Sequence, residues 1–205
     1  MSEKRTRIKI CGMRRQEDIE YVNAVLPDYV GFIFAEGKRR TISEETARLL
    51  RSVLDVRIKP VGVFIDQSPE WVAHLLNSGV IEVAQLHGTE DEDYIATLRE
   101  LTRKEIFQAF QIRSEEDIQK ALASTADMLL LDSGTGSGVT FDWSLLENVD
   151  RQFILAGGLA LENVSEAVLK IRPYGVDVSS GVETDGWKDQ EKIRSFVEKV
   201  REISL

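Results

Sequence analysis

The run Asp127-Met128-Leu129-Leu130-Leu131-Asp132 decides the fold class of this chain. Four apolar residues stand in a row between two aspartates, without the apolar and polar alternation that marks a half-exposed strand. Strands with continuous apolar runs are covered on both faces, as in a parallel sheet flanked by helices. The stretch therefore predicts an α/β protein in which residues 127–131 form one strand of a parallel sheet.

Units of the same kind repeat on both sides of this strand. The expected strands are residues 8–10, 29–34, 59–65, 82–86, 105–110, 127–131, 152–155 and 175–178. Each is followed by an amphipathic run that we expect to be helical. These runs are residues 16–25, 43–54, a third that begins at 68–70, then 91–101, 114–123, 141–147, 160–171 and 189–203. Eight such units in 205 residues are typical of a single-domain (β/α)8 TIM barrel, here spanning residues 1–205.

A doubly wound open sheet is the alternative fold. It usually carries a glycine-rich dinucleotide-binding turn after its first strand. The sequence at that point is Cys11-Gly12-Met13-Arg14, which lacks this glycine pattern. The barrel is therefore the preferred interpretation.

Composition narrows the possible functions. The net charge of −9 argues against binding nucleic acid through phosphate neutralisation, although backbone amides can still bind a small anion. A single cysteine excludes an internal disulfide and fits a reducing compartment, and with two histidines it argues against a catalytic zinc site. The sequence shows no signal peptide and no apolar stretch of membrane-spanning length. We expect a cytoplasmic protein with no metal, membrane or nucleic-acid partner.

Reactive groups in a barrel gather where strands end and the βα loops begin. Cys11, the single cysteine, follows the first expected strand and is well placed for chemistry, with a small buried hydrophobe as the alternative. Asp132 follows the run 128–131, where desolvation would raise its proton affinity and suit a general acid. An aspartate that caps a helix or orders a loop is the alternative.

Two further strand ends have the composition of a phosphate site. Gly157-Gly158 follows the seventh strand and lets the backbone approach a ligand closely, and a helix from residue 160 would present free amides. Ser179-Ser180-Gly181 follows the eighth strand and adds hydroxyl and amide donors. Barrels commonly bind phosphate with the loops after strands seven and eight. We therefore favour a phosphate site over a simple glycine turn.

Three other strand ends offer groups that can bind a substrate. Arg39 and Arg40 lie in a short basic run, and either can pair bidentately with a carboxylate, with a solvated charge run as the alternative. His87 can hydrogen-bond a ligand or serve only its loop. Asp177, on the eighth strand, is a further candidate for substrate binding.

Eight short motifs occur in order from one end of the chain to the other. They are Lys9-Ile10-Cys11-Gly12, Gly31-Phe32-Ile33-Phe34, Val61-Gly62-Val63-Phe64, Gln85-Leu86-His87-Gly88, Leu131-Asp132, Gly136-Ser137-Gly138 with Phe141-Asp142-Trp143, Ala156-Gly157-Gly158-Leu159, and Val176-Asp177-Val178-Ser179-Ser180-Gly181-Val182-Glu183. Each is weak alone, but together they resemble the phosphoribosylanthranilate isomerase family of tryptophan biosynthesis.

The resemblance implies a reaction and roles. The reaction is the Amadori rearrangement of N-(5-phosphoribosyl)anthranilate to 1-(2-carboxyphenylamino)-1-deoxyribulose 5-phosphate, which needs no cofactor. Cys11 would be the general base and would have to act as a thiolate, so its proton affinity must be lowered locally, with Lys9 as one possible source. Asp132 would be the general acid, and the loops at 157–158 and 179–181 would hold the substrate phosphate.

An arginine after the second strand would face the anthranilate carboxylate, but the chain departs from the family's usual Ser-x-Arg motif there. An alignment on Ile42-Ser43 places this arginine at Arg40, which we prefer, and an alignment on 34–38 places it at Arg39. Both arginines therefore stay candidates.

Two other functions stay open. An enzyme similar to indole-glycerol-phosphate synthase would share the barrel and the phosphate loops, but it relies on lysine and glutamate where this chain has Cys11 and Asp132. A non-catalytic phosphosugar-binding barrel would keep Gly157, Gly158 and Ser180 and would need neither of them. The sequence leaves open whether the protein is a monomer or a homodimer, and whether it also accepts the related histidine-pathway aminoaldose.

Overall fold

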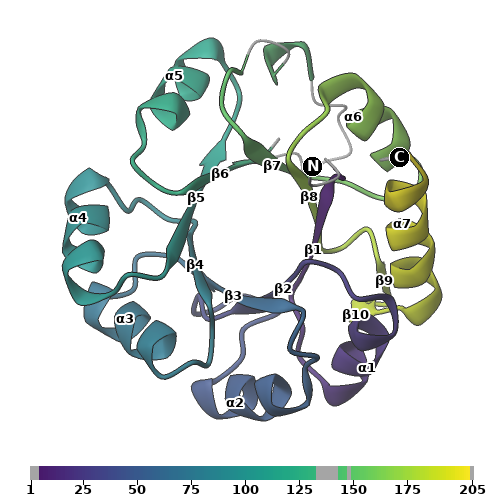
Figure 1. The fold of residues 1–205 in the computed structure, drawn as a ribbon, viewed down its shortest axis with the longest axis horizontal. Coiled ribbons are helices and arrows are strands. Elements are labelled where there is room, and N and C mark those ends of the chain that lie inside the picture. The colour runs from purple at the N-terminus through teal and green to yellow at the C-terminus, as the bar shows by residue number, and fades with distance from the viewer. Residues whose placement is uncertain (1–4, 133–142, 147–148, 204–205) are drawn as a thin grey trace.

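Eight parallel strands close into a barrel, in which each strand pairs with the next in sequence and β8 pairs with β1 (Figure 1). The computed structural model describes residues 5–132, 143–146 and 149–203. The strands are β1 Arg7–Cys11, β2 Tyr29–Ile33, β3 Lys59–Phe64, β4 Val83–Leu86, β5 Glu105–Gln111, β6 Met128–Asp132, β7 Phe153–Ala156 and β8 Gly175–Val178. The predicted (β/α)8 barrel is confirmed, and the open sheet is excluded.

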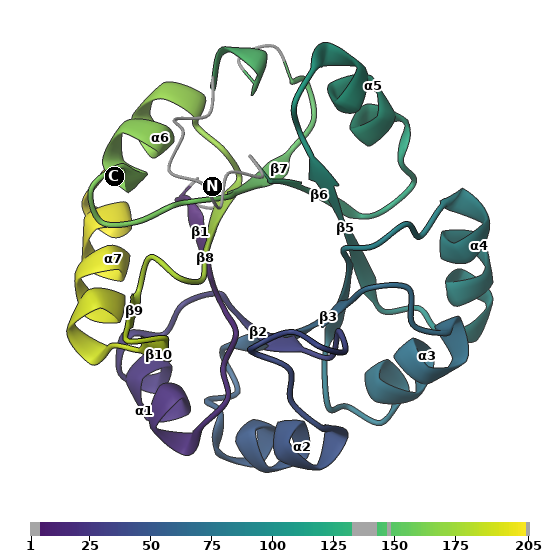
Figure 2. The same cartoon turned by 180° about the vertical axis from the view of Figure 1, so that it is seen from behind.

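Helices cover the outside of the barrel (Figure 2). The α-helices in the described residues are α1 Gln16–Val25, α2 Glu44–Val53, α3 Pro69–Asn77, α4 Glu92–Leu101, α5 Glu115–Ala123, α6 Val164–Ile171 and α7 Gln190–Ile203. Helix α7 packs against both α6 and α1, which joins the end of the chain to its beginning. None of these helices combines the length and the apolar character needed to cross a membrane.

Residues 143–146 form a 3-10 helix, η1 Trp143–Leu146, where the sequence predicted a short helix over 141–147. The remaining residues of that predicted helix lie outside the described part of the chain. The same is true of the glycine-rich segment within 133–142.

Side chains at the helix N-termini explain where several helices begin. Ser43, Ser68, Asp91 and Ser114 precede α2, α3, α4 and α5, and each accepts a hydrogen bond from a backbone amide in the first turn. Such caps satisfy amides that have no partner within the helix.

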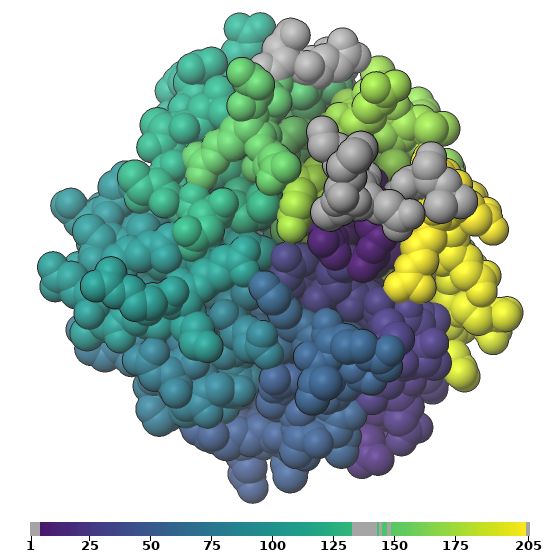
Figure 3. Space-filling view, viewed as in Figure 1, coloured from purple at the N-terminus to yellow at the C-terminus, as the bar shows by residue number. Residues whose placement is uncertain are grey.

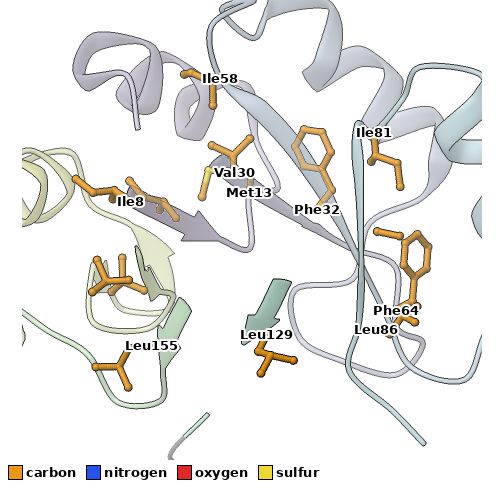
Figure 4. Close-up of a cluster of buried hydrophobic side chains, with 14 of the residues drawn as sticks. Ile8, Met13, Val30, Phe32, Ile58, Phe64, Ile81, Leu86, Leu129 and Leu155 are labelled. Atoms are coloured by element: carbon orange, nitrogen blue, oxygen red, sulfur yellow. The ribbon is translucent and has the colours of Figure 1, made fainter. Parts of the chain in front are cut away.

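Two apolar layers explain why the strands read as continuous apolar runs. In β6, Met128 and Leu130 belong to a cluster inside the barrel, while Leu129 and Leu131 pack into the larger cluster between the sheet and the helices. Figure 4 shows part of that outer layer. Side chains also close the middle of the ring (Figure 3). Asp132 continues the inward-facing set of β6, at the carboxyl end of the barrel.

A β-hairpin after β8 was not predicted. It pairs β9 Glu183–Thr184 with β10 Trp187–Lys188, and the two turn residues, Asp185 and Gly186, have φ of 50° and 79°. Positive φ at both positions is the requirement of a type I′ turn. The Trp187 ring lies 3.9 Å from Arg14 Cζ, which fixes the hairpin to the segment before α1.

Candidate active site

Cys11 occupies the carboxyl end of β1 and is 6% exposed. Its neighbours in the strand, Ile8 and Ile10, pack toward the helices, so the alternating residues Lys9 and Cys11 face the barrel interior. Gly31 stands opposite Cys11 in the β1–β2 pairing. A Cβ atom on Gly31 would lie 2.5 Å from the cysteine Sγ, so this glycine makes room for the thiol.

A buried ion pair lies one layer below the thiol. Lys9 Nζ is 2.9 Å from Asp177 Oδ2, and the lysine side chain is fully buried. Burial alone would lower the pKa of Lys9, but the attraction of Asp177 and of Cys11 outweighs it and raises that pKa. Lys9 is therefore a fixed positive charge beside the cysteine. Asp177 Oδ1 is also buried and has no partner among the described residues, so this carboxylate retains one oxygen that can accept a hydrogen bond.

The electrostatics of Cys11 differ from the expectation of a lowered proton affinity. Burial raises the pKa of the thiol, and Lys9 and Lys188 oppose this shift only in part. The raised pKa favours a protonated thiol at neutral pH, and Lys9 and Lys188 are placed to favour its ionisation.

Arg39 and Arg40 both pair with Glu183 of the hairpin, whose side chain is 5% exposed. Arg40 contacts it through Nε at 2.6 Å and Nη2 at 2.9 Å, and Arg39 through Nη2 at 2.6 Å. Burial would raise the pKa of Glu183, but these hydrogen bonds and Lys188 hold it at about 2. Glu183 therefore stays ionised and fixes the basic run, which is not a free surface charge.

Arg40 is the arginine beside the cysteine. Its Cδ would lie 2.5 Å from a Cβ atom on Gly12, the residue after Cys11, whose φ of 91° favours glycine. The Arg40 side chain is 21% exposed and that of Arg39 is 51% exposed. Arg39 turns toward the hairpin instead, where its Nη1 donates to Gly186 O at 2.7 Å.

Lys188 and Glu183 belong to the candidate site, but sequence reasoning missed Lys188 and gave Glu183 no role beyond its place in one of the eight motifs. The Lys188 side chain is 1% exposed, and its Nζ donates to Ser179 O at 2.7 Å and to Glu183 Oε1 at 3.0 Å. The dipeptide Asp185-Gly186 was the available signal, because it is a strong marker of a hairpin that returns the chain two residues later.

The two predicted phosphate loops lie side by side, since Ala160 and Gly181 form a β-bridge. A Cβ atom on Gly181 would overlap the carbonyl oxygen of Leu159, so only glycine allows this approach. Gly157 and Gly158 have φ of 93° and 64°, which also favours glycine.

The prediction that a helix begins near residue 160 is wrong, because α6 begins at Val164. The Ala160 amide donates to Asn163 Oδ1 at 2.9 Å, and Asn163 Nδ2 donates to Gly158 O at 3.0 Å. The asparagine therefore holds a turn where free helical amides were expected. On the neighbouring loop, the Ser179 hydroxyl donates to Cys11 O at 3.1 Å.

Asp132 lies near His87 on the opposite part of the barrel mouth. His87 Nε2 is 3.8 Å from Asp132 Oδ2, and His87 Nδ1 is 3.2 Å from Gln85 Nε2. Asp177 is close enough for its charge to interact with both Asp132 and His87. The strand ends thus bring together a thiol, two carboxylates, an imidazole and several fixed cations, which are groups suited to proton transfer on an anionic substrate. Among the described residues, no three His, Cys, Asp or Glu side chains are grouped to hold a metal ion.

Comparisons with known proteins show the family. A family model described as N-(5'phosphoribosyl)anthranilate (PRA) isomerase matches residues 8–199. A relative from Acetivibrio thermocellus, named N-(5'-phosphoribosyl)anthranilate isomerase, is 46% identical over 211 residues and covers 96% of each chain.

Solved structures match as well. The phosphoribosyl anthranilate isomerase from Thermotoga maritima has a TM-score of 0.88 and 36% identity, covering 96% of this chain and 99% of that one. A phosphoribosyl anthranilate isomerase in complex with reduced 1-(o-carboxyphenylamino)-1-deoxyribulose 5-phosphate has a TM-score of 0.86 and 35% identity, with the same coverage. The chain therefore belongs to the N-(5'-phosphoribosyl)anthranilate isomerase family.

Proposed function

We propose that this isomerase converts N-(5'-phosphoribosyl)anthranilate to 1-(2-carboxyphenylamino)-1-deoxyribulose 5-phosphate in tryptophan biosynthesis. The observation that carries the proposal is the setting of Cys11, an inward-facing thiol at a strand end with two buried ammonium groups close to it. A cysteine serving only as a core hydrophobe needs no buried cations. Asp132 ends β6 at the same mouth, because all strands of the barrel run parallel.

In the proposed mechanism, protonated Asp132 donates its proton to the furanose ring oxygen, and the ring opens to a Schiff base. The Cys11 thiolate then removes the proton from carbon 2 of the sugar, and the resulting enolamine tautomerises to the ketone. Lys9 and Lys188 lower the cost of forming the thiolate, because each places a positive charge near the sulfur in a water-poor environment. The chemistry needs no cofactor or metal, so we expect activity to survive chelators.

Substrate binding uses the rest of the mouth. Gly157, Gly158, Ser179, Ser180 and Gly181 are the proposed phosphate ligands, mainly through backbone amides, since the Ser179 hydroxyl proton is engaged by Cys11 O.

The remaining ligands would hold the aromatic and sugar parts. Arg40 is proposed to bind the anthranilate carboxylate, and because Glu183 uses its Nε and Nη2, the approach is expected from the Nη1 side. Arg39 stays the weaker candidate because it is more exposed. The unpartnered oxygen of Asp177 is proposed to bind a sugar hydroxyl, and His87, whose Nε2 lies 3.8 Å from Asp132 Oδ2, is proposed to line the site beside the general acid.

The direct test is turnover of freshly prepared N-(5'-phosphoribosyl)anthranilate, followed as loss of anthranilate fluorescence. We expect activity in the presence of a chelator, and a parallel assay with the histidine-pathway aminoaldose would measure specificity. Tight binding of a reduced product analogue without turnover would instead support a non-catalytic phosphosugar-binding barrel. Release of indole-glycerol phosphate from the ketose product would support the synthase-like alternative. A cytoplasmic location and the choice between monomer and homodimer remain predictions.

A further inference from the structure

Gln85 is a buried polar side chain to which the proposed mechanism gives no role. It is 1% exposed and shares the inward face of β4 with Val83, a member of the apolar cluster inside the barrel. Its Oε1 atom is buried and has no partner among the described residues. A buried amide with an unsatisfied oxygen costs stability that an apolar residue would not, so its NH2 group is expected to have a function.

The NH2 group of Gln85 faces His87. Gln85 Nε2 lies 3.2 Å from His87 Nδ1, and on the other side of the ring His87 Nε2 lies 3.8 Å from Asp132 Oδ2. With its amide in this orientation Gln85 donates, and the Nδ1 atom that it faces accepts as the unprotonated nitrogen of a neutral imidazole. The ring proton is then on Nε2, which is the nitrogen directed at Asp132.

We propose that Gln85 is a positioning residue that holds His87 in the Nε2–H tautomer, with the donor directed at Asp132. This inference rests on the proposed function, in which Asp132 is the proton donor. Once Asp132 has given its proton to the substrate, a donor at His87 Nε2, 3.8 Å from its Oδ2, favours the new negative charge. The opposite tautomer would present a lone pair to the new negative charge.

A purely structural role for Gln85 is disfavoured because the segment around His87 is held by other groups. The His87 amide donates to Phe64 O at 2.9 Å. Glu90 accepts from the amides of Asp66 and Gly88 at 2.8 Å and 2.7 Å, which ties the two neighbouring loops together. These contacts fix the backbone, and the contact from Gln85 fixes only the ring.

The first test is long-range ¹H–¹⁵N NMR of the histidine rings, at a pH where both imidazoles are neutral. The chain has two histidines, and His74 lies exposed on α3, so a His74→Gln variant assigns the spectrum and His74 serves as an internal control. We expect His87 to show a protonated Nε2 and an unprotonated Nδ1. In Gln85→Glu, which is isosteric and accepts at the same place, we expect the proton to move to Nδ1. In Gln85→Met we expect a mixture.

The second test is kinetic. Gln85→Glu and Gln85→Met should lower kcat by about tenfold or more with little change in KM, the usual effect of losing a group that orients a site residue. In His87→Gln, the glutamine amide donates from near the former Nε2 position and has no tautomer for Gln85 to select. Adding Gln85→Met to this variant should therefore change kcat by less than about twofold.

The two sets of results separate the two proposals. An Nδ1–H tautomer in the native protein, or a tautomer unchanged in Gln85→Glu, would overturn the role of Gln85 whatever the activity. Equal losses from Gln85→Met in both backgrounds would also overturn it, as a general structural defect. Absence of turnover in the native protein would contradict the proposed function and leave the tautomer result standing.

Discussion

Gly31 stands opposite Cys11 in the β1–β2 pairing, and a methyl group on its Cα would come within 2.5 Å of the cysteine sulfur. We therefore expect Gly31→Ala to displace the thiol and to lower kcat by about 10²-fold, because small misplacements of a reacting group have effects of that size. The measurement is steady-state turnover of a variant shown by circular dichroism to be folded.

Gly79→Ala is the control for a loss of stability alone, because its φ of 76° strains an alanine while a Cβ atom there meets nothing within 4 Å. It should lose stability without losing kcat. Native turnover in a folded Gly31→Ala protein would show that the thiol position is not critical.

Cys11→Ser should keep the fold and nearly abolish turnover, because an alcohol is a far poorer base than a thiolate. The drop should be at least about 10²–10⁴-fold, the usual contribution of a positioned proton-transfer group. Turnover close to native in the serine variant would return Cys11 to the role of a buried hydrophobe.

The raised pKa of Cys11 also has a consequence for stability. The unfolded thiol ionises near its ordinary pKa of about 8.5, before the folded one does. The unfolded state then binds fewer protons, so the free energy of unfolding should fall as pH rises above that value. Urea unfolding at neutral and alkaline pH should show a smaller alkaline loss in Cys11→Ser. The difference in thiolate absorbance between the native protein and Cys11→Ser should titrate at a pH above the ordinary pKa of cysteine.

Arg40→Ala should raise KM by roughly thirtyfold, because loss of a charged hydrogen bond costs about 2 kcal/mol of binding. Arg39→Ala should have a smaller effect, since its side chain is more exposed and turns toward Gly186. Glu183→Gln is the control for disturbing the shared carboxylate. The reverse ranking would assign the carboxylate contact to Arg39, and no effect from either arginine would remove both from substrate binding.

Asp132→Asn should lower turnover by roughly 10²–10⁴-fold while affinity for a reduced product analogue stays within a few-fold. The asparagine keeps the size and most hydrogen bonding but cannot donate the proton. Calorimetric titration and turnover should be measured on the same preparation. Intact turnover would show that Asp132 is not the acid, and joint loss of binding and turnover would make it a residue that orders the site, with Asp177 the next candidate.

Glu183 should make the stability of the protein depend on acid pH. Its folded pKa of about 2 lies below the ordinary value of about 4.3 in an unfolded chain. It therefore contributes stability that is fully present above the unfolded value and is lost as pH falls toward the folded one. The urea midpoints of the native protein and of Glu183→Gln should be measured at pH 7 and at pH 3. The difference between the two proteins should be larger at pH 7. An equal difference at both pH values would contradict this linkage.

The local sequence pattern predicted the barrel because each strand is covered on both faces. The run at 128–131 is apolar throughout, since its residues pack alternately into the inner and the outer apolar cluster. The start of α6 was predicted wrongly, because Ala160 is held both by Asn163, three residues along the chain, and by Gly181, a residue brought to it only by the closed sheet.

For the charged groups of the site, too, local features could be predicted from sequence and long-range contacts could not. Cys11 and Asp132 were predicted from their place at strand ends. The raised pKa of the thiol was not, because it depends on burial by several strands together. The contact of Arg40 with Glu183 spans 143 residues of sequence, and no local pattern encodes such a distance. Lys188 was within reach, since the Asp185-Gly186 turn predicts its hairpin.

The pairing of β1 with β8, joined on its inner face by Lys9 and Asp177, separates the thiol in synthesis from the groups that surround it. Cys11 is made before Asp177 and Lys188, which complete its ionic surroundings. Until β8 and the hairpin are in place, β1 lacks one of its two neighbouring strands, and the nascent thiol is open to oxidants and to premature contacts with other chains. The proposed base therefore gains its surroundings only when the sheet closes.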